Sequence, residues 1–290
     1  MQTAKSLDEL RQAVDSLRVR AREVALVPTM GALHQGHLSL VRQAQRSADA
    51  VVVSIFVNPT QFGPNEDLGA YPRQLEEDAR KLQAEGVDLL WAPPVEEVYP
   101  QGFATSISVS GLSDGLCGAS RPGHFDGVAT VVAKLFNQVR PDVAVFGEKD
   151  WQQLAVIRRM ARDLDLTQPH PHRILGAPIV REPDGLALSS RNRYLSADER
   201  QRAATLPRLM REAVKALADG ATVDETTASL TQGLLAAGFA HVDYVEVADA
   251  VTLQPLARVL REPARLFVAA RLGATRLIDN LQVDTGPSHP

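Results

Sequence analysis

The sequence of 290 residues contains a single cysteine, Cys117, and no long run of apolar residues. One cysteine excludes a disulfide within the chain and a zinc site made of cysteines, and it is typical of a reducing compartment. No apolar run approaches the roughly 20 residues of a membrane-spanning helix, and the polar N-terminus lacks the pattern of a secretory signal. We therefore expect a cytoplasmic protein with no membrane partner.

Excess basic charge is absent as well. The formal net charge is −4, from 31 Lys and Arg against 35 Asp and Glu. Without a strong positive field, nucleic acid is not an expected partner. Apolar residues make up 44% of the chain and charged residues 23%, the proportions of an ordinary globular protein. The length allows two ordinary domains or one large domain.

The most informative stretch is residues 24–40, which read VALVPTMGALHQGHLSL. The pattern predicts a short buried strand over 24–27 that stops at Pro28, a glycine turn, and a helix over 36–47. Such a turn is typical of a phosphate site, because a helix N-terminus has unpaired N–H groups and a partial positive charge. His34 and His37 lie three residues apart there and can point the same way. Two alternatives are a structural turn whose histidines bond to the backbone and a metal pair, although no third ligand has suitable spacing.

Strands and helices alternate through the first part of the chain. Apolar runs predict a parallel sheet covered on both faces, a Rossmann-like doubly wound α/β fold, with polar motifs gathered at the carboxyl edge of the sheet. Residues 111–124 are rich in glycine and predict a mobile loop, which leaves open whether they form a lid. The predicted helices are 6–20, with Ser6 and Glu9 as a capping box, 72–85, ended by Gly86, 125–139 and 151–163, and the further strands are 50–57, 87–91, 105–110 and 142–146.

The pattern changes after residue 178, and we expect two domains, 1–178 and 179–290, the second a smaller α+β domain. It begins with a polar loop over 181–194, and a capping box of Ser196 and Glu199 opens a helix that continues to 218. A second helix over 222–237 and three strands, 241–247, 264–271 and 276–283, complete the domain. The tail from Asp284 is expected to fray.

Three further motifs carry polar chemistry. The amides of Asn58 and Gln61 both donate and accept, which suits a substrate with hydroxyl and carboxylate groups, although a plain turn is the alternative. In Gly147–Asp150, followed by Gln153, Lys149 can bind phosphate, while Asp150 can instead be a simple helix cap. The hydroxyls and guanidinium of Ser189–Arg191 can clamp an anion, although a flexible surface loop is equally compatible with the sequence.

An acidic run lies on the predicted helix over 72–85. Glu76, Glu77 and Asp78 are adjacent, and such a run is usually a solvated helix face. If the beginning of this helix faces the cleft, Asp78 is the candidate metal ligand, holding a divalent ion through water.

Taken together, these segments resemble the pantothenate synthetase family, the pantoate–β-alanine ligases. The family belongs to the nucleotidyltransferase superfamily and shares its histidine motif with class I aminoacyl-tRNA synthetases, in which a lysine-rich signature takes the place of Ser189–Arg191. No motif position departs from the family pattern. The five matching blocks follow the family's order over residues 28–196 and read PTMGALHQGHLSL, FVNPTQFGPNEDLGAYPR, RPGHFDGVATVV, FGEKDWQQL and DGLALSSRNRYLS.

The resemblance implies the last step of pantothenate biosynthesis. ATP and (R)-pantoate would form pantoyl adenylate and pyrophosphate, and β-alanine would then displace AMP. This chemistry needs positioning and charge neutralisation at the α-phosphate rather than a side-chain nucleophile. The resemblance also implies Mg²⁺ held mainly by the phosphates of ATP, a homodimer formed through the first domain, and a second domain that covers the active site.

The resemblance further implies residue roles. His37, as proton donor, acts with His34, Lys149 and Arg191 in catalysis. Pantoate is held by Gln61, Gln153 and Asn58, and β-alanine by Gln61. The implied ATP-binding residues are Met30, Gly31, Ala32, Leu33, His34, Gln35, Gly36, His37, Gly147, Glu148, Lys149, Asp150, Val180, Leu188, Ser189, Ser190 and Arg191.

Two rival functions use the same histidine turn. An adenylyltransferase would join ATP to a phosphorylated acceptor such as phosphopantetheine, but the amides of Asn58–Gln61 suit uncharged or carboxylate groups better than a second phosphate. A nucleotide sensor would bind ATP without turnover, but His37, Lys149 and Arg191 are all present. The rate-limiting step, the direct metal ligands, the charge of His37 and the angle of domain closure lie beyond the sequence.

Overall fold

The computed structural model describes residues 1–64, 66–258 and 263–283 and divides into two compact units. The first unit comprises Met1–Ser113, Arg121–Glu148 and Gln153–Pro178. The second comprises Ile179–Pro290 together with two earlier segments, Asp114–Ser120 and Lys149–Gln152. A single boundary in the sequence does not assign these two segments to the second unit, because it is their contacts with residues far along the chain that place them there. The predicted frayed tail from Asp284 lies outside the described residues.

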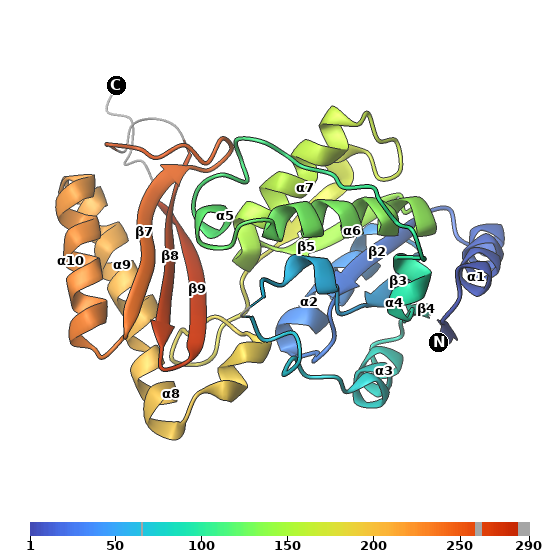
Figure 1. Ribbon diagram of the computed structural model, residues 1–290, viewed down its shortest axis with the longest axis horizontal. Coiled ribbons are helices and arrows are strands. Elements are labelled where there is room, and N and C mark those ends of the chain that lie inside the picture. The colour runs from blue at the N-terminus through green and yellow to red at the C-terminus, as the bar shows by residue number, and fades with distance from the viewer. Residues whose placement is uncertain (65, 259–262, 284–290) are drawn as a thin grey trace. The chain divides into compact units, whose positions relative to one another are not determined.

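The first unit contains a six-stranded sheet in the order β1-β4-β3-β2-β5-β6, and its neighbouring strands pair in parallel (Figure 1). The chain proceeds outward from β2 through β3 to β4 and then crosses over to β5, so β2 and β5 meet at a topological switch point. Ligands of open α/β sheets bind beyond the carboxyl ends of strands at such a point. The Rossmann-like fold is confirmed. The strands are β1 (Gln2–Ala4), β2 (Val24–Thr29), β3 (Ala50–Ile55), β4 (Leu89–Trp91), β5 (Val143–Gly147) and β6 (Ile174–Ala177).

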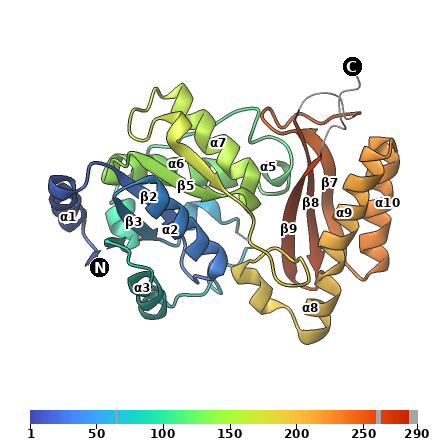
Figure 2. The same ribbon diagram turned by 180° about the vertical axis from the view of Figure 1, so that it is seen from behind.

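Helices cover both faces of this sheet (Figures 1 and 2). On one face, Val41 of α2 and Leu82 of α3 share a buried cluster with Val27 of β2 and Val53 of β3. On the other face lie α1 and α6. The helices of this unit are α1 (Leu7–Arg20), α2 (Gln35–Ser47), α3 (Leu75–Ala84), α4 (Val95–Val98), α6 (His124–Val139) and α7 (Trp151–Asp163), whose first two residues belong to the second unit.

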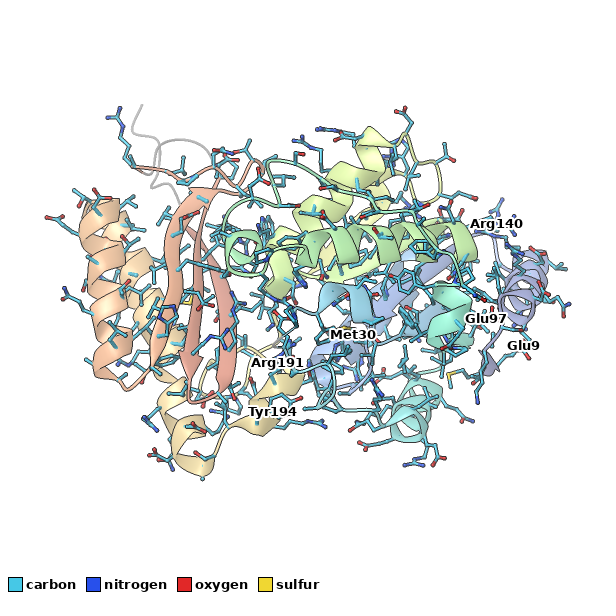
Figure 3. The ribbon with its side chains drawn as sticks, in the orientation of Figure 1. Glu9, Met30, Glu97, Arg140, Arg191 and Tyr194 are labelled. Atoms are coloured by element: carbon cyan, nitrogen blue, oxygen red, sulfur yellow. The ribbon has the colours of Figure 1, made fainter. Side chains whose placement is uncertain are left out.

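Hydrogen bonds hold α1 at its beginning and near its middle. The predicted capping box of Ser6 and Glu9 is confirmed at its beginning. Glu97, next to this end of the helix, accepts a 2.9 Å hydrogen bond from the backbone N–H of Leu7. Arg140, beyond the end of α6, donates to Asp15 of α1 at 2.8 Å. Glu97 and Arg140 are labelled beside α1 in Figure 3.

The prediction that the first strand stops at Pro28 is wrong, because β2 continues to Thr29. The carbonyl of Thr29 accepts from Phe56 N on the β3 side, so the preceding residue directs its backbone polar groups toward β5. β5 pairs with β2 only at Ala25 and Leu26. The missing N–H of Pro28 therefore breaks no hydrogen bond to β5, and the strand can continue through the proline.

Several other predictions are also corrected. Residues 105–110 are not a strand, and Ile107 N instead donates to Thr130 Oγ1 of α6 at 2.9 Å. The predicted helix up to 218 is two helices, α8 (Ala197–Ala203) and α9 (Thr205–Ala218), and the short elements β1, β6 and α4 are missed by the periodicity. None of the helices in the described ranges combines the length and the apolar character needed to cross a membrane.

The second unit is built on an antiparallel sheet of β7 (His241–Asp249), β8 (Ala264–Leu272) and β9 (Thr275–Val283), which confirms the three predicted strands. Leu266 and Val268 of β8 lie in a buried cluster with α9 and α10 (Val223–Ala236), which lie beside the sheet in Figure 2.

A side chain of β7 and the main chain just after β7 contact the two earlier segments. Tyr244 Oη lies 3.0 Å from Cys117 Sγ, and Trp151 Nε1 donates to Ala250 O at 2.8 Å. The predicted mobile loop over 111–124 thus contains a short helix, α5 (Cys117–Ser120), that is bonded to the sheet of the second unit.

Candidate active site

The two motif histidines together cap the beginning of α2. His34 is the N-cap residue, and its Nδ1 accepts from the backbone N–H of Gly36 at 3.2 Å. His37 Nδ1 accepts from the backbone N–H of His34 at 3.3 Å, and the two ring centroids are 4.1 Å apart. Because each Nδ1 is an acceptor, the proton of each neutral ring is assigned to Nε2. The turn therefore orients two imidazole N–H donors at a helix N-terminus.

A buried carboxylate shapes the chain just before these histidines. Asp78 of α3 has no exposed surface, and its Oδ2 and Oδ1 accept from Ala32 N at 2.8 Å and Leu33 N at 2.9 Å. Lys81 Nζ, from the next turn of α3, donates to the carbonyl of Leu33 at 2.9 Å. Gly31 and Ala32 both have left-handed φ angles, +86° and +52°.

These contacts give Asp78 a structural role in the histidine turn. Its assignment to a metal ion stays a prediction. Within residues 1–64, 66–258 and 263–283, no group of three or more His, Cys, Asp and Glu side chains is placed to hold a metal ion.

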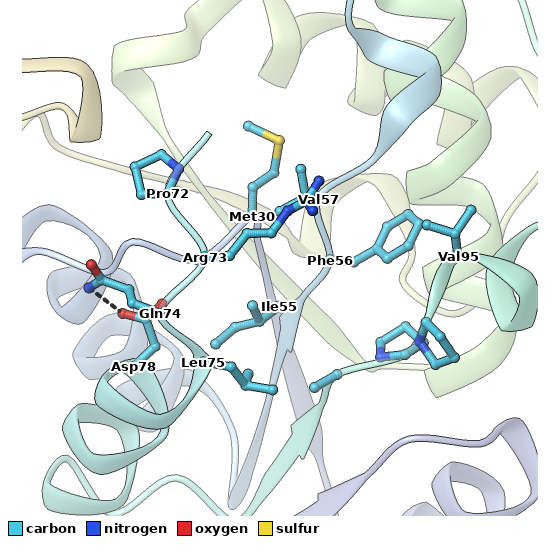
Figure 4. Close-up of a pocket in the computed structure, with 14 residues that line it drawn as sticks. Met30, Ile55, Phe56, Val57, Pro72, Arg73, Gln74, Leu75, Asp78 and Val95 are labelled. Carbon is cyan, nitrogen blue, oxygen red and sulfur yellow. Dashed lines mark hydrogen bonds between the residues drawn. The ribbon is translucent and has the colours of Figure 1, made fainter. Parts of the chain in front are cut away.

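A pocket of about 270 Å³ opens beside the histidine turn, at the carboxyl ends of β3 and β4 (Figure 4). Met30 and Phe56 contribute apolar surface, while Arg73 and Gln74 bring polar groups. Gln74 Nε2 donates to Asp78 Oδ1 at 3.2 Å, the dashed line in Figure 4. Pockets that enclose drug-sized ligands usually measure roughly 300–1,000 Å³, so the volume of this pocket lies just below that range.

The Asn58–Gln61 motif lies beside the histidine turn. Asn58 is 1% exposed, and its Nδ2 donates to Gln61 Oε1 at 3.0 Å. The Gln61 amide continues to Met30, whose Sδ lies 3.2 Å from Gln61 Nε2. Two predicted site segments, which follow the different strands β2 and β3, are thus brought together. The hydrogen bond from Asn58 fixes the orientation of the Gln61 amide. The direct contact of Asn58 with pantoate stays a prediction.

Sequence reasoning missed the hydroxyl that completes this network. Tyr99 donates to Asn58 Oδ1 at 2.8 Å, and Thr60 Oγ1 donates to the same oxygen at 2.9 Å. Burial raises the pKa of the Tyr99 phenol, so its proton remains available for donation. Tyr99 lies within residues 92–103, a stretch with three prolines and no clear periodicity, which carries no signal for this role.

Gly127, in the interior of α6, is another missed residue. A methyl group there would lie 2.5 Å from Thr60 O and 2.7 Å from Gln61 N, so only glycine permits this approach. Its carbonyl also accepts from Asn58 Nδ2 at 3.1 Å. The sequence signal was a glycine inside an otherwise apolar helix, within a block that matched the family but had no assigned role.

The same block also holds the backbone of Gln61. His124 Nδ1 lies 2.8 Å from Gln61 O, and Arg121 Nη2 donates to that oxygen at 3.3 Å. Arg121 forms an ion pair with Glu66 at 2.5 Å. Burial alone would raise the pKa of the Glu66 carboxyl, but the hydrogen bond and charge of Arg121 hold that pKa below its ordinary value.

The predicted Gly147–Asp150 corner is divided between the units. Gly147 ends β5 and Glu148 follows it, both in the first unit, which also holds Gln153 of α7. Lys149 and Asp150 belong to the second unit, with Lys149 Nζ 3.8 Å from Asp150 Oδ2.

The Ser189–Arg191 segment lies entirely in the second unit. Ser189 caps a 3₁₀ turn, η4 (Ser190–Tyr194), by accepting from Arg191 N at 3.3 Å (Arg191 and Tyr194 in Figure 3). The chain before it doubles back, and Leu188 N donates to Val180 O at 2.9 Å. This contact brings together Val180, Leu188 and Ser189, three of the residues predicted to bind ATP.

Comparisons with known proteins find similarity over nearly the whole chain. The family model described as pantoate-beta-alanine ligase matches residues 2–282. A pantothenate synthetase of Novosphingobium aromaticivorans is 66% identical over 283 residues, covering 98% of this chain and 99% of the relative.

Solved structures are similar over nearly the whole chain. The pantothenate synthetase of Thermus thermophilus has a TM-score of 0.91 at 49% identity, covering 98% of this chain and 99% of the other. A pantoate-beta-alanine ligase of Francisella tularensis, solved with beta-gamma ATP and beta-alanine, has a TM-score of 0.81 at 35% identity, covering 99% and 100%. From its motifs, its fold and these likenesses, the chain belongs to the pantoate–β-alanine ligase family.

Proposed function

We propose that the protein condenses (R)-pantoate with β-alanine in two steps that consume ATP. In the first step, a carboxylate oxygen of pantoate bonds to the α-phosphorus of ATP and pyrophosphate leaves. In the second step, the amine of β-alanine attacks the acyl carbon of the pantoyl adenylate, loses a proton, and AMP leaves with the electron pair of the broken C–O bond. The two-histidine cap of α2, at the carboxyl end of β2, is the observation that carries this proposal.

The histidines act on the phosphates. The Nε2–H groups of His34 and His37 donate to phosphate oxygens on which negative charge grows as the α-phosphorus is attacked, and His37 serves as the proton donor. The N-terminus of α2 adds its partial positive charge at the same turn. Main-chain atoms of Met30–His37 line the nucleotide.

Gln61, Gln153 and Asn58 act on the acid. Gln61 donates to the carboxylate or hydroxyl groups of pantoate and contacts β-alanine in the second step, and Gln153 supplies a second amide. Asn58 holds the side-chain oxygen of Gln61, which directs the amide N–H₂ group of Gln61 toward Met30. Because amides carry no charge, they suit a carboxylate substrate better than the phosphorylated acceptor of an adenylyltransferase.

The second unit provides its own set of phosphate ligands, and Lys149, Ser189, Ser190 and Arg191 bind the triphosphate. Gly147–Asp150, Val180 and Leu188 border the nucleoside. Mg²⁺ is held mainly by the phosphates of ATP, as is usual for this ion, and when bound it neutralises their charge. The family resemblance also supports a homodimer, which sedimentation velocity can test.

The decisive experiment measures AMP release with pantoate and β-alanine together and with each omitted. We expect AMP only with both acids and pantoate-dependent ATP–pyrophosphate exchange without β-alanine. Exchange that depends on a phosphorylated acceptor would favour the adenylyltransferase, and ATP binding without exchange would favour the sensor. His37→Ala should abolish most exchange, while His170→Ala, on an exposed surface turn, should leave it unchanged.

A further inference from the structure

Two adjacent residues of β9 each hold one of the phosphate-binding segments of the second unit. Asp279 and Asn280 are 3% and 2% exposed. Successive side chains of a strand point to opposite faces, so the two residues act on opposite sides of the sheet. Polar side chains buried inside a strand are unusual and need partners.

Asn280 holds the main chain at Lys149. Its Nδ2 donates to Lys149 O at 3.0 Å, while its Oδ1 accepts from Arg265 Nε at 2.9 Å. The guanidinium of Arg265 in turn stacks on Trp151, with Cζ 3.7 Å from the ring centroid. The carbonyl of Lys149 and the ring two residues later are thus both bound to side chains of β8 and β9.

Asp279 holds the strand-like segment that leads to Ser189. Its two oxygens accept from Arg181 Nη1 and Nη2 at 2.6 and 2.9 Å, a bidentate pair in which the Asp279 side chain is 1% exposed. Arg181 forms a β-bridge with Ala187 and donates to Gly185 O at 3.0 Å. This pair therefore fixes both sides of the turn from which Leu188 and Ser189 emerge.

We propose that Asp279 and Asn280 are positioning residues that keep Lys149 in a constant relation to Ser189–Arg191. The inference rests on the proposed function, in which these segments bind the triphosphate. Neither β9 residue touches a substrate in this proposal, and each acts through the main chain or the arginine that it binds. Catalysis by positioning is sensitive to such support, because a misplacement of about 1 Å can cost roughly 100-fold in rate.

The first test is Asn280→Asp in the full chain. This change keeps the shape and the acceptor for Arg265 but removes the donor to Lys149 O. We expect kcat for AMP formation to fall by roughly 10- to 100-fold. Gln282→Glu is the matched control, since it makes the same amide-to-carboxylate change at an exposed position of the same strand, and it should leave kcat unchanged.

A double-mutant cycle separates positioning from general stability. Lys149→Ala alone should lower kcat, and Asn280→Asp should have no further effect in the Lys149→Ala background. A full additional loss in that background, or an unchanged kcat in Asn280→Asp alone, would overturn the inference while leaving the proposed function intact. If Lys149→Ala itself has no effect, the proposed role of Lys149 fails as well, so the two failures are distinguishable.

A second variant covers the case in which Asn280→Asp does not fold. Arg181→Lys keeps the charge opposite Asp279 but loses the bidentate geometry, and Arg181 is partly exposed. We expect a fall in kcat that disappears in an Arg191→Ala background. A fall that persists there at full size, or no fall in the single variant, would overturn the inference for the Asp279 side.

Discussion

Asp78 Oδ2 accepts a 2.8 Å hydrogen bond from the backbone N–H of Ala32, a residue with a left-handed φ of +52°. The other oxygen of the same carboxylate accepts from Leu33 N at 2.9 Å. Two successive N–H groups can converge on one acceptor because the chain is left-handed at Gly31 and Ala32. The turn that orients His34 is therefore held by the buried carboxylate of Asp78, which belongs to a different helix, α3.

Replacing Asp78 by Asn should destabilise the protein and misplace the histidines. The Asn side chain would offer an N–H₂ group to one of two backbone donors, leaving a buried N–H without an acceptor. We expect the free energy of unfolding to fall by about 2–3 kcal/mol, the cost of losing a hydrogen bond to a charged group. Urea denaturation measures the loss, and pantoate-dependent exchange should fall in the fraction that is folded.

The control for Asp78→Asn is Glu76→Gln, which removes the same charge from an exposed position of α3. It should leave both the unfolding free energy and the exchange rate within error of the unmodified protein. Equal behaviour of the two variants would contradict the role of Asp78 in the turn.

Gly127→Ala tests the close approach of α6 to the Asn58–Gln61 motif. Helix propensity alone favours alanine by about 1 kcal/mol. A methyl group 2.5 Å from Thr60 O must displace backbone, so we expect an overpacking cost of about 3 kcal/mol, at the upper end of the usual range. The net result should be a lower melting temperature and a raised KM for pantoate, because Gln61 moves.

Gly233→Ala is the matched control, since Gly233 also lies inside a helix. There the nearest atoms to an added methyl group are the side-chain tip of Leu209 at 3.0 and 3.3 Å, which can rotate away. This variant should be neutral or slightly more stable. A Gly127→Ala variant as stable as Gly233→Ala would show that the approach of α6 has no steric consequence.

The sequence predicted elements whose signal is local. The capping boxes at Ser6 and Ser196 and the apolar periodicity of the main helices and strands are confirmed. Residues 105–110 show the limit, because alternation favours a strand only where a partner strand exists, and here Thr130 of α6 provides the partner instead.

The support of the candidate site was less predictable. In the sequence, Asp78 belongs to an acidic run with Glu76 and Glu77, and such a run is usually a solvated helix face. In the structure Glu76 and Glu77 are exposed, whereas Asp78 is buried and accepts a hydrogen bond from Ala32 N. Asn280 and Lys149 are separated by 131 positions in the sequence, so no local pattern joins them. The motifs are visible in the sequence as local patterns, whereas the residues that hold them depend on long-range packing.

The pair of Glu66 and Arg121 predicts a pH dependence of stability. Because the pKa of Glu66 is lower in the folded protein than its ordinary value of 4.5, the pair stabilises the fold above that pH. The stabilisation is lost as the pH falls through the lowered folded pKa. Urea denaturation of the protein and of Glu66→Gln should give a difference that is constant above about pH 5.5 and shrinks at lower pH. A difference that stays the same down to about pH 3 would contradict this ion pair.

Asn58 and Tyr99 give a prediction in which two changes to one hydrogen-bond network differ in size. Tyr99→Phe removes one of several donors to Asn58 Oδ1, because Thr60 Oγ1 remains at 2.9 Å, so we expect a loss of only about 1 kcal/mol. Asn58→Asp instead places a buried carboxylate oxygen against the oxygens of Gln61 and Gly127, which now lie 3.0 and 3.1 Å from Nδ2.

Two acceptors facing a buried charge with no donor between them should cost at least about 3 kcal/mol in unfolding free energy. The KM for pantoate should rise more than the KM for ATP, because Gln61 loses the donor that orients it. Denaturation and steady-state kinetics of both variants measure the contrast. Equal losses in the two variants would mean that Asn58 acts only as an acceptor, and its amide group would then have no part in orienting Gln61.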